Sequence, residues 1–375
     1  MCLFPKLVNN PKYRVNKKNG GNVPPLKDGR VKFVPIGCGY CYECMKKKAN
    51  EWKIRLAEDI KEHENGKFVT LTFSSEAFEE LKEKVIKKAK KDIKGYALDN
   101  AIATLGVRLF LERVRKKTNK SLRHWLITEL GGRGTENIHL HGIIYSDTWD
   151  IIDEKWQYGY IWPRKGSVHR KKNYVSERTV NYTIKYVTKT DKKHPNYKPK
   201  ILCSKGIGKR YTKTRAFKQN KYNADETDET YRTRAGAKIA LPIYYRNKVY
   251  SDEEREKLWI QKLDSGERWI GGDKVRADDE EQIEELLRYH QRLNSEMGYG
   301  SPKTWGVMKY EQERKLIISW GFSPLNAQRY YEFSFIFVLY SFCCGCGPHT
   351  HFSDVVGRKL RRPCSLESCY IVDYY

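Results

Sequence analysis

Two histidines and one carboxylate are the first residues whose types and spacing suggest chemistry. His139 and His141 flank Leu140 in an apolar run over residues 138–145. Because alternate residues of a β-strand point to the same face, both imidazoles project one way and Leu140 projects into the opposite layer. Two neutral imidazoles side by side can hold one divalent metal ion. Glu129, near the end of the preceding predicted strand, comes roughly opposite His139 and can supply a third ligand.

A second set of reactive side chains lies about forty residues further on. Tyr182 and Tyr186 are four residues apart and Lys189 follows three later, within a predicted helix over about 177–188. This spacing puts all three on one helix face, while Ile184 and Val187 point elsewhere and can anchor the helix to the sheet. Two phenols and an ammonium on one exposed stripe are poor core material.

Each set alone has a simpler explanation. A bare His-x-His pattern is often a pair of polar residues satisfied at a sheet edge. A tyrosine stripe with a lysine often packs against a core, with the ammonium reaching solvent. The two sets together favour chemistry, because neither simple explanation requires them to occur in one chain.

Phosphodiester transfer is the reaction that these groups would suit. A phenol has an unperturbed pKa of roughly 10 and needs help to attack a phosphate at neutral pH. A metal ion on the histidines can polarise the scissile phosphate, and Lys189 can stabilise the charge that develops. Attack would leave the 5′ end of DNA on tyrosine and free a 3′-OH. A second tyrosine could take over the strand later, which gives the pair Tyr182 and Tyr186 a chemical reason.

The elements around these residues predict an α+β fold, with a central antiparallel sheet flanked by helices. Residues 68–73 alternate as a strand, and Ser74 or Ser75 can cap the helix that follows. Residues 125–129 and 138–145 form a predicted hairpin around the glycines at 131, 132 and 134. A further strand is predicted from four alternating aromatic residues, for which sheet packing is favoured over base stacking: Trp156, Tyr158, Tyr160 and Trp162. A charged helical extension is predicted over about 251–294.

Net charge restricts the partners of the chain. The 375 residues carry a formal net charge of +26, and 13 % are aromatic. Such an excess favours nucleic acid as the partner, although a ribosomal or solvated basic surface is the alternative. The chain opens without a signal-peptide pattern, and its longest apolar stretch, 333–342, is too short for a membrane span. We therefore expect a cytoplasmic protein without a membrane partner.

The cysteine spacing indicates a second metal site. Cys38, Cys41 and Cys44 follow a C-x-x-C-x-x-C pattern, and Cys2 can be a fourth ligand if the N-terminal arm folds back. Four thiolates suit structural Zn²⁺. The alternatives are a stripe of buried thiols on one helix face and, with less support, an iron–sulfur cluster. Five of the ten cysteines lie in the last fifty residues, and the motif there that includes Cys343, Cys344 and Cys346 has no assigned role.

The chain resembles the replication initiator proteins of small single-stranded-DNA microviruses, particularly the gokushovirus-like phages of gut bacteria. The resemblance covers roughly residues 1–320. It rests on segments that occur in this order: Met1–Leu3 with Pro5–Lys6, Cys38–Cys44, Phe68–Thr72, Glu129–His141, the helix with Tyr182, Tyr186 and Lys189, and Ser204–Lys209. It implies a His-hydrophobic-His (HUH) endonuclease core with Mg²⁺ or Mn²⁺ bound, two-tyrosine chemistry, and nicking with ligation at an origin. It also implies single-stranded origin DNA as substrate, a bacterial host cytoplasm, and host replication proteins such as a helicase as partners.

We expect four segments in the chain. They are an N-terminal arm with the cysteine cluster (1–50), the nicking and joining core (51–225), a helical extension (226–320) and a tail without assigned role (321–375). The competing hypothesis is a zinc-stabilised DNA- or RNA-binding protein without cleavage activity, which explains the charge and the cysteines equally well. It gives no reason for histidines and a tyrosine stripe to converge. A plasmid-transfer relaxase shares the chemistry but usually adds a third histidine, which this sequence does not place.

Overall fold

The computed structural model describes residues 1–89, 92–131, 137–191, 193–194, 197–302 and 305–319. All of them fall within one compact unit, residues 1–322. Most of the predicted glycine turn, from residue 132 on, and the cysteine-rich tail lie outside the described residues. Within the described ranges, no helix is both long enough and apolar enough to cross a membrane.

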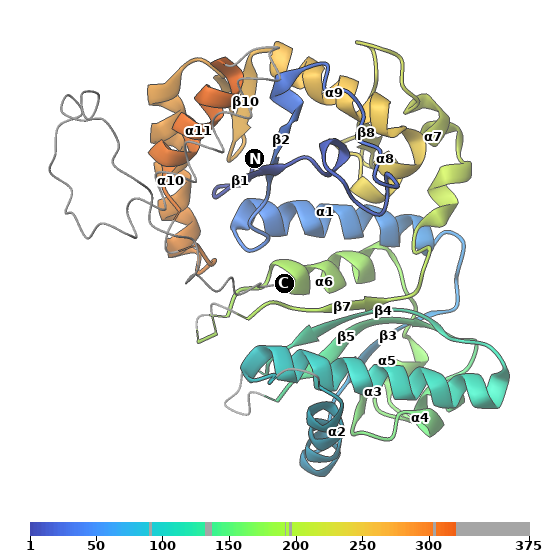
Figure 1. Cartoon of the computed structure of the whole chain (residues 1–375). Coiled ribbons are helices and arrows are strands. Elements are labelled where there is room, and N and C mark those ends of the chain that lie inside the picture. Colours follow the sequence, from blue (N-terminus) through green and yellow to red (C-terminus); the bar gives the residue numbers. More distant parts are fainter. Residues whose placement is uncertain (90–91, 132–136, 192, 195–196, 303–304, 320–375) are drawn as a thin grey trace, which may run out of the picture. The chain divides into compact units, whose positions relative to one another are not determined.

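A five-stranded antiparallel sheet contains the histidines (Figure 1). Its order is β6-β3-β5-β4-β7, and every neighbouring pair is antiparallel. The strands are β3 (Gly66–Leu71), β4 (Arg123–Glu129), β5 (His139–Tyr145), β6 (Ile161–Trp162) and β7 (Ile201–Cys203). The histidine strand β5 is the middle one, as its apolar residues on both faces predict. The predicted α+β class with a central antiparallel sheet is confirmed.

The register of this sheet aligns the predicted metal ligands. In the β4–β5 pair, Glu129 lies opposite His139 and Ile127 lies opposite His141. In the β3–β5 pair, Thr70 lies opposite His141. The predicted approach of Glu129 to His139 is therefore a direct cross-strand pair, in which side chains lie within contact distance.

A glycine directly after the second histidine lets β4 and β5 approach closely. A Cβ atom on Gly142 would lie 2.0 Å from the carbonyl oxygen of Trp125 and 2.8 Å from Cα of Leu126. Both contacts are with backbone, which cannot move without opening the strand pair. Only glycine therefore fits beside His141 at this register.

One face of the sheet is covered by α2 (Ser75–Lys88), α3 (Gly95–Thr118) and α4 (Asp150–Lys155). Leu140 and Ile144 of β5 belong to the buried cluster on this side, together with Phe110 of α3. The predicted cap is present, because the Ser74 side chain accepts a hydrogen bond from the amide of Ala77 at the start of α2. Leu140 therefore points away from the layer that its neighbouring histidines face, as strand alternation predicts.

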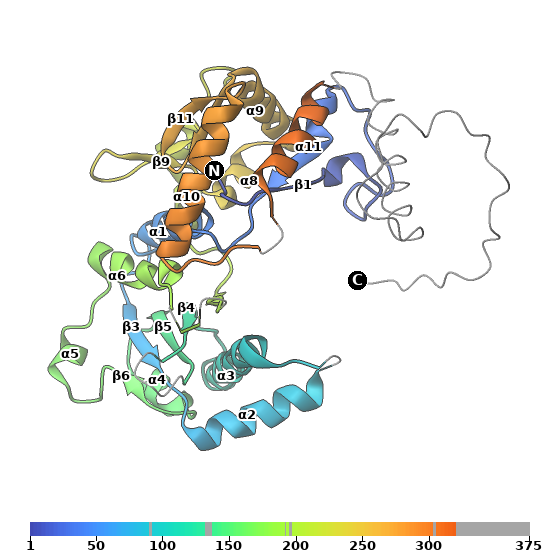
Figure 2. The ribbon, with the colours of Figure 1, turned by 90° about the vertical axis from the view of Figure 1, so that its left-hand side faces the viewer.

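The opposite face is covered by α6 (Glu177–Thr188), which in turn packs against α1 (Tyr42–Asp59). Figure 1 shows the order sheet, α6, α1, and Figure 2 again shows α6 on the side of the sheet away from α3. Val180 and Val187 of α6 are buried with Ile143 of β5. A capping box between Ser176 and Thr179 starts the helix. The predicted helix over 177–188 is confirmed.

The aromatic segment over 156–162 differs in part from its predicted strand. Only β6 is a strand, because Trp156 and Tyr158 follow α4 and fill the core on the α3 side. Tyr160 and Trp162 are 50 % and 38 % exposed. Core packing, favoured by the sequence for most of these residues, holds for the first two. The short helix α5 (Val168–Lys171) follows.

The remaining elements lie before α1 and after β7. The N-terminal segment contains β1 (Lys6–Asn9), β2 (Phe33–Ile36) and two 3₁₀ turns, η1 (Pro11–Tyr13) and η2 (Gly29–Val31). After β7 come η3 (Lys209–Lys213), α7 (Arg215–Gln219), β8 (Thr230–Arg232), β9 (Lys238–Ala240) and α8 (Ile243–Val249). The predicted charged extension contains α9 (Asp252–Asp264) and α10 (Glu280–Glu296), with the hairpin β10 (Glu267–Ile270) and β11 (Asp273–Arg276) between them and α11 (Val307–Ser319) beyond.

Candidate functional site

Glu129, His139 and His141 form one cluster of metal-ligand type. A carboxylate oxygen and one nitrogen from each ring all lie within 4.8 Å of one another. Glu129 Oε2 lies 2.7 Å from Nε2 of His141 and 3.2 Å from Nε2 of His139. Ligands bound at about 2.1 Å to one octahedral ion lie roughly 3 Å apart, so this donor set fits a single divalent cation.

Two further contacts orient the imidazoles. His139 Nδ1 lies 3.1 Å from the carbonyl oxygen of Asn137, and His141 Nδ1 lies 2.9 Å from the hydroxyl of Thr70. Because a carbonyl oxygen only accepts, Nδ1 of His139 donates, and Nε2 of the neutral ring presents its lone pair to Glu129. Metal-bound histidines commonly use their other nitrogen in this way. Nothing in the sequence pattern marks Thr70, since only the β3–β5 register pairs it with His141.

The protonation of the cluster suits metal binding. Burial raises the pKa of Glu129, but hydrogen bonds from His139, His141 and Lys189 outweigh burial and hold this pKa well below its ordinary value. Burial lowers the pKa of His141, with the hydrogen bond to Glu129 acting in the opposite direction. The cluster therefore favours a carboxylate and a neutral His141 imidazole, which are the forms that bind metal ions.

The two predicted tyrosines lie directly against this cluster. The ring of Tyr186 stacks on the ring of His141, with centroids 4.1 Å apart and planes 9° from parallel. The hydroxyl of Tyr186 donates a hydrogen bond of 3.0 Å to the hydroxyl of Tyr182. Tyr186 is 6 % exposed, whereas Tyr182 is 47 % exposed. The structure therefore brings the tyrosine pair and the histidine pair together, with Tyr182 as the member open to solvent.

The two hydroxyls differ in acidity. The hydrogen bond from Tyr186 lowers the pKa of Tyr182 against the effect of burial, and Lys185 lowers it further. Burial, and then the contact with Tyr182, raise the pKa of Tyr186. Lys185 Nζ lies 3.6 Å from the centroid of the Tyr182 ring. The sequence analysis did not select Lys185, although a spacing of three residues on a helix places it beside Tyr182.

Lys189 reaches the cluster from the end of α6. It is the C-cap residue of the helix, and its ammonium forms an ion pair with Glu129 Oε1. Its Nζ lies 5.9 Å from the ring centroid of Tyr186. The predicted lysine is therefore at the site, paired with the carboxylate ligand. An ammonium in this place can turn to a phosphate when a metal ion takes over the carboxylate.

Aromatic side chains connect the exposed edge of the sheet with Tyr182. Trp162 of β6 contacts Phe68 of β3 edge-on at a centroid distance of 5.8 Å. Phe68 contacts Tyr182 in the same manner at 5.5 Å. The exposed ring of Trp162 thus lies one side chain away from the exposed tyrosine.

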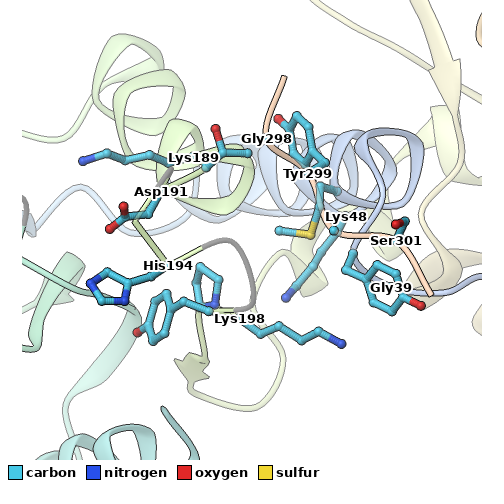
Figure 3. A pocket seen from close by; sticks show the side chains of 15 residues that line it. Gly39, Lys48, Lys189, Asp191, His194, Lys198, Gly298, Tyr299 and Ser301 are labelled. Carbon is cyan, nitrogen blue, oxygen red and sulfur yellow. The ribbon is translucent and has the colours of Figure 1, made fainter. Parts of the chain in front are cut away.

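A cavity of about 410 Å³ opens beside Lys189. Figure 3 shows Lys48 of α1, Lys189 and Lys198 among the residues around it. Tyr40 is part of its wall, and Lys198 Nζ lies 4.4 Å from the centroid of the Tyr40 ring. Three lysines in the lining suit the cavity to an anionic group.

A second cluster of metal-ligand type consists of the four predicted cysteines, Cys2, Cys38, Cys41 and Cys44, whose sulfur atoms all lie within 4.8 Å of one another. The N-terminal segment does fold back, so that Cys2 joins the other three. Cys41 is the N-cap residue of α1, and Cys38 precedes it. The alternative of a thiol stripe along one helix face is therefore wrong, since only Cys44 lies within α1.

Residues 66–191 match a family model described as replication-associated protein ORF2. No curated protein and no solved structure matches the chain. The matched segment begins with β3 and includes Glu129, both histidines, both tyrosines and Lys189. The predicted resemblance to replication initiators is confirmed at the level of this family. Over the segment that holds this site, the chain is similar to replication initiators of the rolling-circle type.

Proposed function

We propose that the chain nicks and rejoins single-stranded DNA at a replication origin, as an endonuclease of the HUH type with a 5′-phosphotyrosine intermediate. One observation carries this proposal: the ring of Tyr186 stacks on His141, beside a three-residue metal-ligand cluster. The family match supports a role in replication. We propose further that residues 51–225 hold the groups needed for cleavage and that a phage-type single-stranded genome carries the origin.

The metal that we propose for this cluster is Mg²⁺ or Mn²⁺. Glu129 Oε2 and the Nε2 atoms of His139 and His141 would hold it, and a mixed carboxylate and imidazole set suits Mn²⁺ well. When bound, the ion would polarise the scissile phosphate and neutralise part of its charge. Thr70 and Asn137 would keep the two imidazoles in the orientation that the ion needs. The cysteine cluster offers softer ligands, so its metal is a separate proposal.

We infer that Tyr182 attacks first. It is the more exposed tyrosine, and its pKa is lowered by the hydrogen bond from Tyr186. In the proposed step, its phenolic oxygen forms a bond to phosphorus, and the bond from phosphorus to the 3′ oxygen breaks. That oxygen leaves with a proton as a 3′-OH. Rejoining is the reverse reaction, and the ester bond to tyrosine retains the energy that it needs.

Tyr186 has two roles in this proposal. In the first step its hydroxyl donates to the Tyr182 oxygen, which stabilises the phenolate that attacks. After one genome length has been copied, Tyr186 attacks the regenerated origin while Tyr182 still holds the first end. Lys185 and Lys189 stabilise negative charge on the phenolate and on the phosphate respectively.

The exposed aromatic residues of the sheet edge are the proposed path of the DNA strand. Tyr160 and Trp162 are partly exposed, and Trp162 is linked to Tyr182 through Phe68. Bases of unpaired DNA stack on such rings without strong sequence preference. A base on Trp162 would bring the neighbouring phosphates toward Tyr182, and the high positive charge of the chain would attract the strand.

The test is covalent adduct formation. The purified chain is incubated with end-labelled single-stranded DNA that contains the origin and with Mn²⁺, and the products are separated under denaturing conditions. We expect a labelled protein band that depends on Mn²⁺ and disappears in the double variant Tyr182→Phe, Tyr186→Phe. If the double variant still binds the DNA, the loss is one of chemistry. If the wild-type protein binds this DNA and never forms an adduct, a non-catalytic DNA-binding protein is the better description.

A further inference from the structure

We propose that Cys2, Cys38, Cys41 and Cys44 bind one structural Zn²⁺ ion, separate from the proposed catalytic metal. The sulfur atoms of Cys2 and Cys41 lie 3.8 Å apart, and those of Cys38 and Cys44 lie 4.0 Å apart. Four thiolates around a tetrahedral zinc ion at about 2.3 Å have sulfur atoms about 3.8 Å from one another. The four side chains thus already have the spacing of a tetrathiolate zinc site.

Disulfide bonds do not account for this arrangement. All four residues are free cysteines. A disulfide would need a sulfur–sulfur distance of about 2.05 Å, and four sulfur atoms in one group would form two separate pairs. Here the sulfur atoms form a single group within 4.8 Å, which is the arrangement that one shared ion requires.

The backbone around the sulfurs favours thiolates. The amides of Phe4 and Cys38 lie 3.3 Å and 3.2 Å from Sγ of Cys2, and the amide of Cys41 lies 3.3 Å from Sγ of Cys38. Each of these N–H groups donates to sulfur and stabilises negative charge there. Gly39 has φ +82°, a left-handed conformation that turns the chain between Cys38 and Cys41.

The close fit extends to the residue before the motif. A Cβ atom on Gly37 would lie 2.9 Å from Sγ of Cys44. Any side chain at this position would therefore push Cys44 away from the other sulfurs. Gly37 offers a way to disturb the site while all four cysteines remain.

The site joins segments that are far apart in the sequence. Trp305 packs edge-on against Phe4 at a centroid distance of 5.5 Å, and its Nε1 donates a hydrogen bond of 2.6 Å to the carbonyl of Pro5. The amide of Tyr42, at the start of α1, donates a hydrogen bond of 2.8 Å to Asn294 at the end of α10. A zinc ion would hold the N-terminal segment at the start of α1, where both segments also contact the C-terminal helical region.

Zinc binding would also order one wall of the lysine-lined cavity. Gly39 and Tyr40 lie between two of the ligands, and both line the cavity that includes Lys189 (Figure 3). The knuckle formed by residues 38–41 can hold Tyr40 in place only while Cys38 and Cys41 are fixed. The zinc site would therefore support the cavity beside the tyrosine helix without contributing a ligand to it.

The first experiment measures metal in the full-length protein. The chain is produced with zinc and iron both supplied, desalted, and analysed by inductively coupled plasma mass spectrometry. We expect one zinc per chain and no iron. The double variant His139→Ala, His141→Ala should also hold one zinc, which separates this ion from the other cluster. A zinc-free wild-type protein with four reactive thiols, or iron in place of zinc, would overturn the proposal.

The second experiment uses matched cysteine variants. Cys44→Ser should lose the zinc and unfold at a lower temperature, whereas Cys203→Ser removes an exposed cysteine outside the cluster and should keep both properties. Gly37→Ala should weaken zinc binding, measured by competition with a chromogenic chelator. If Cys44→Ser does not fold, Co²⁺ replacement in the wild-type protein gives an independent result, because four thiolates produce strong tetrahedral Co²⁺ absorption. A Co²⁺ spectrum of octahedral type, or full zinc content in Cys44→Ser, would contradict the assignment.

Discussion

Tyr186 lies parallel to His141, with ring centroids 4.1 Å apart, while its hydroxyl donates to Tyr182. This one relationship connects the helix that carries the phenols with the strand that carries the imidazoles. The stacked ring is buried and restrained, and the hydroxyl of its partner faces solvent. The proposed division of labour between the two tyrosines follows from this difference.

Single tyrosine variants should have different effects. Tyr182→Phe removes the proposed first nucleophile, so the first-nick adduct should disappear. Tyr186→Phe removes a donor to the attacking oxygen, and the rate of adduct formation should fall about 10²-fold, as for other lost donors to developing charge. Single-turnover kinetics with labelled origin DNA measure both rates. Equal adduct yields in the two variants would contradict the proposed order.

Thr70 should control metal affinity without binding the metal. Thr70→Val removes the hydroxyl that lies 2.9 Å from Nδ1 of His141. Loss of such a contact typically lowers metal affinity about 10- to 100-fold. Titration calorimetry with Mn²⁺ measures the change, and Thr212→Val, in η3, is the control that should bind Mn²⁺ normally. Unchanged affinity in Thr70→Val would show that His141 does not need this contact.

Gly142→Ala should destabilise the central sheet. The added Cβ would meet the backbone of β4 at 2.0 Å, so β4 and β5 must separate. Overpacking of a core typically costs 1–3 kcal/mol, and a clash with backbone should reach or exceed about 3 kcal/mol. Urea denaturation measures the free energy of unfolding. Gly306→Ala is the control, because the nearest atom to its added Cβ is at 4.0 Å, and it should be nearly neutral.

His124 should make stability depend on pH. This residue of β4 is 8 % exposed, and burial lowers its pKa below the ordinary value of 6.5. The unfolded chain therefore takes up a proton near pH 6.5 that the folded chain does not yet accept, so the contribution is full above this pH and is lost as pH falls below it. Urea denaturation at about pH 7.5 and about pH 5.5 should show a smaller difference in His124→Gln than in the wild-type protein. An equal difference in both proteins would assign the pH dependence to other groups.

Trp162 should contribute to binding of single-stranded DNA. Its exposed ring lies at the sheet edge and is linked through Phe68 to Tyr182. Stacking of one base is worth about 1–3 kcal/mol, so Trp162→Ala should weaken binding roughly 5- to 150-fold. Fluorescence anisotropy with labelled DNA measures the affinity. Trp269→Ala is the matched control, because Trp269 is 56 % exposed in β10, away from the central sheet. Equal losses in both variants would point to a general effect on the surface.

Local patterns were sufficient to predict the elements that carry the site. The alternation around His139 and His141 identified a strand that is apolar on both faces, and β5 is indeed the middle strand. The spacing of Tyr182 and Tyr186 identified α6 with its bounds. Helix and strand periods are set by backbone geometry alone, so a short segment of sequence contains this information.

The sequence by itself determined which side chains share a face, and which ligand types were available for a metal. Only the tertiary structure decided that Thr70 faces His141, that Lys185 and the buried Tyr186 make Tyr182 the more acidic phenol, and that Cys2 returns to three cysteines at the start of α1. These relationships depend on strand register, on the docking of α6 against the sheet, and on the path of the N-terminal segment. Each of them is set by contacts between residues far apart in the chain, which no local period contains.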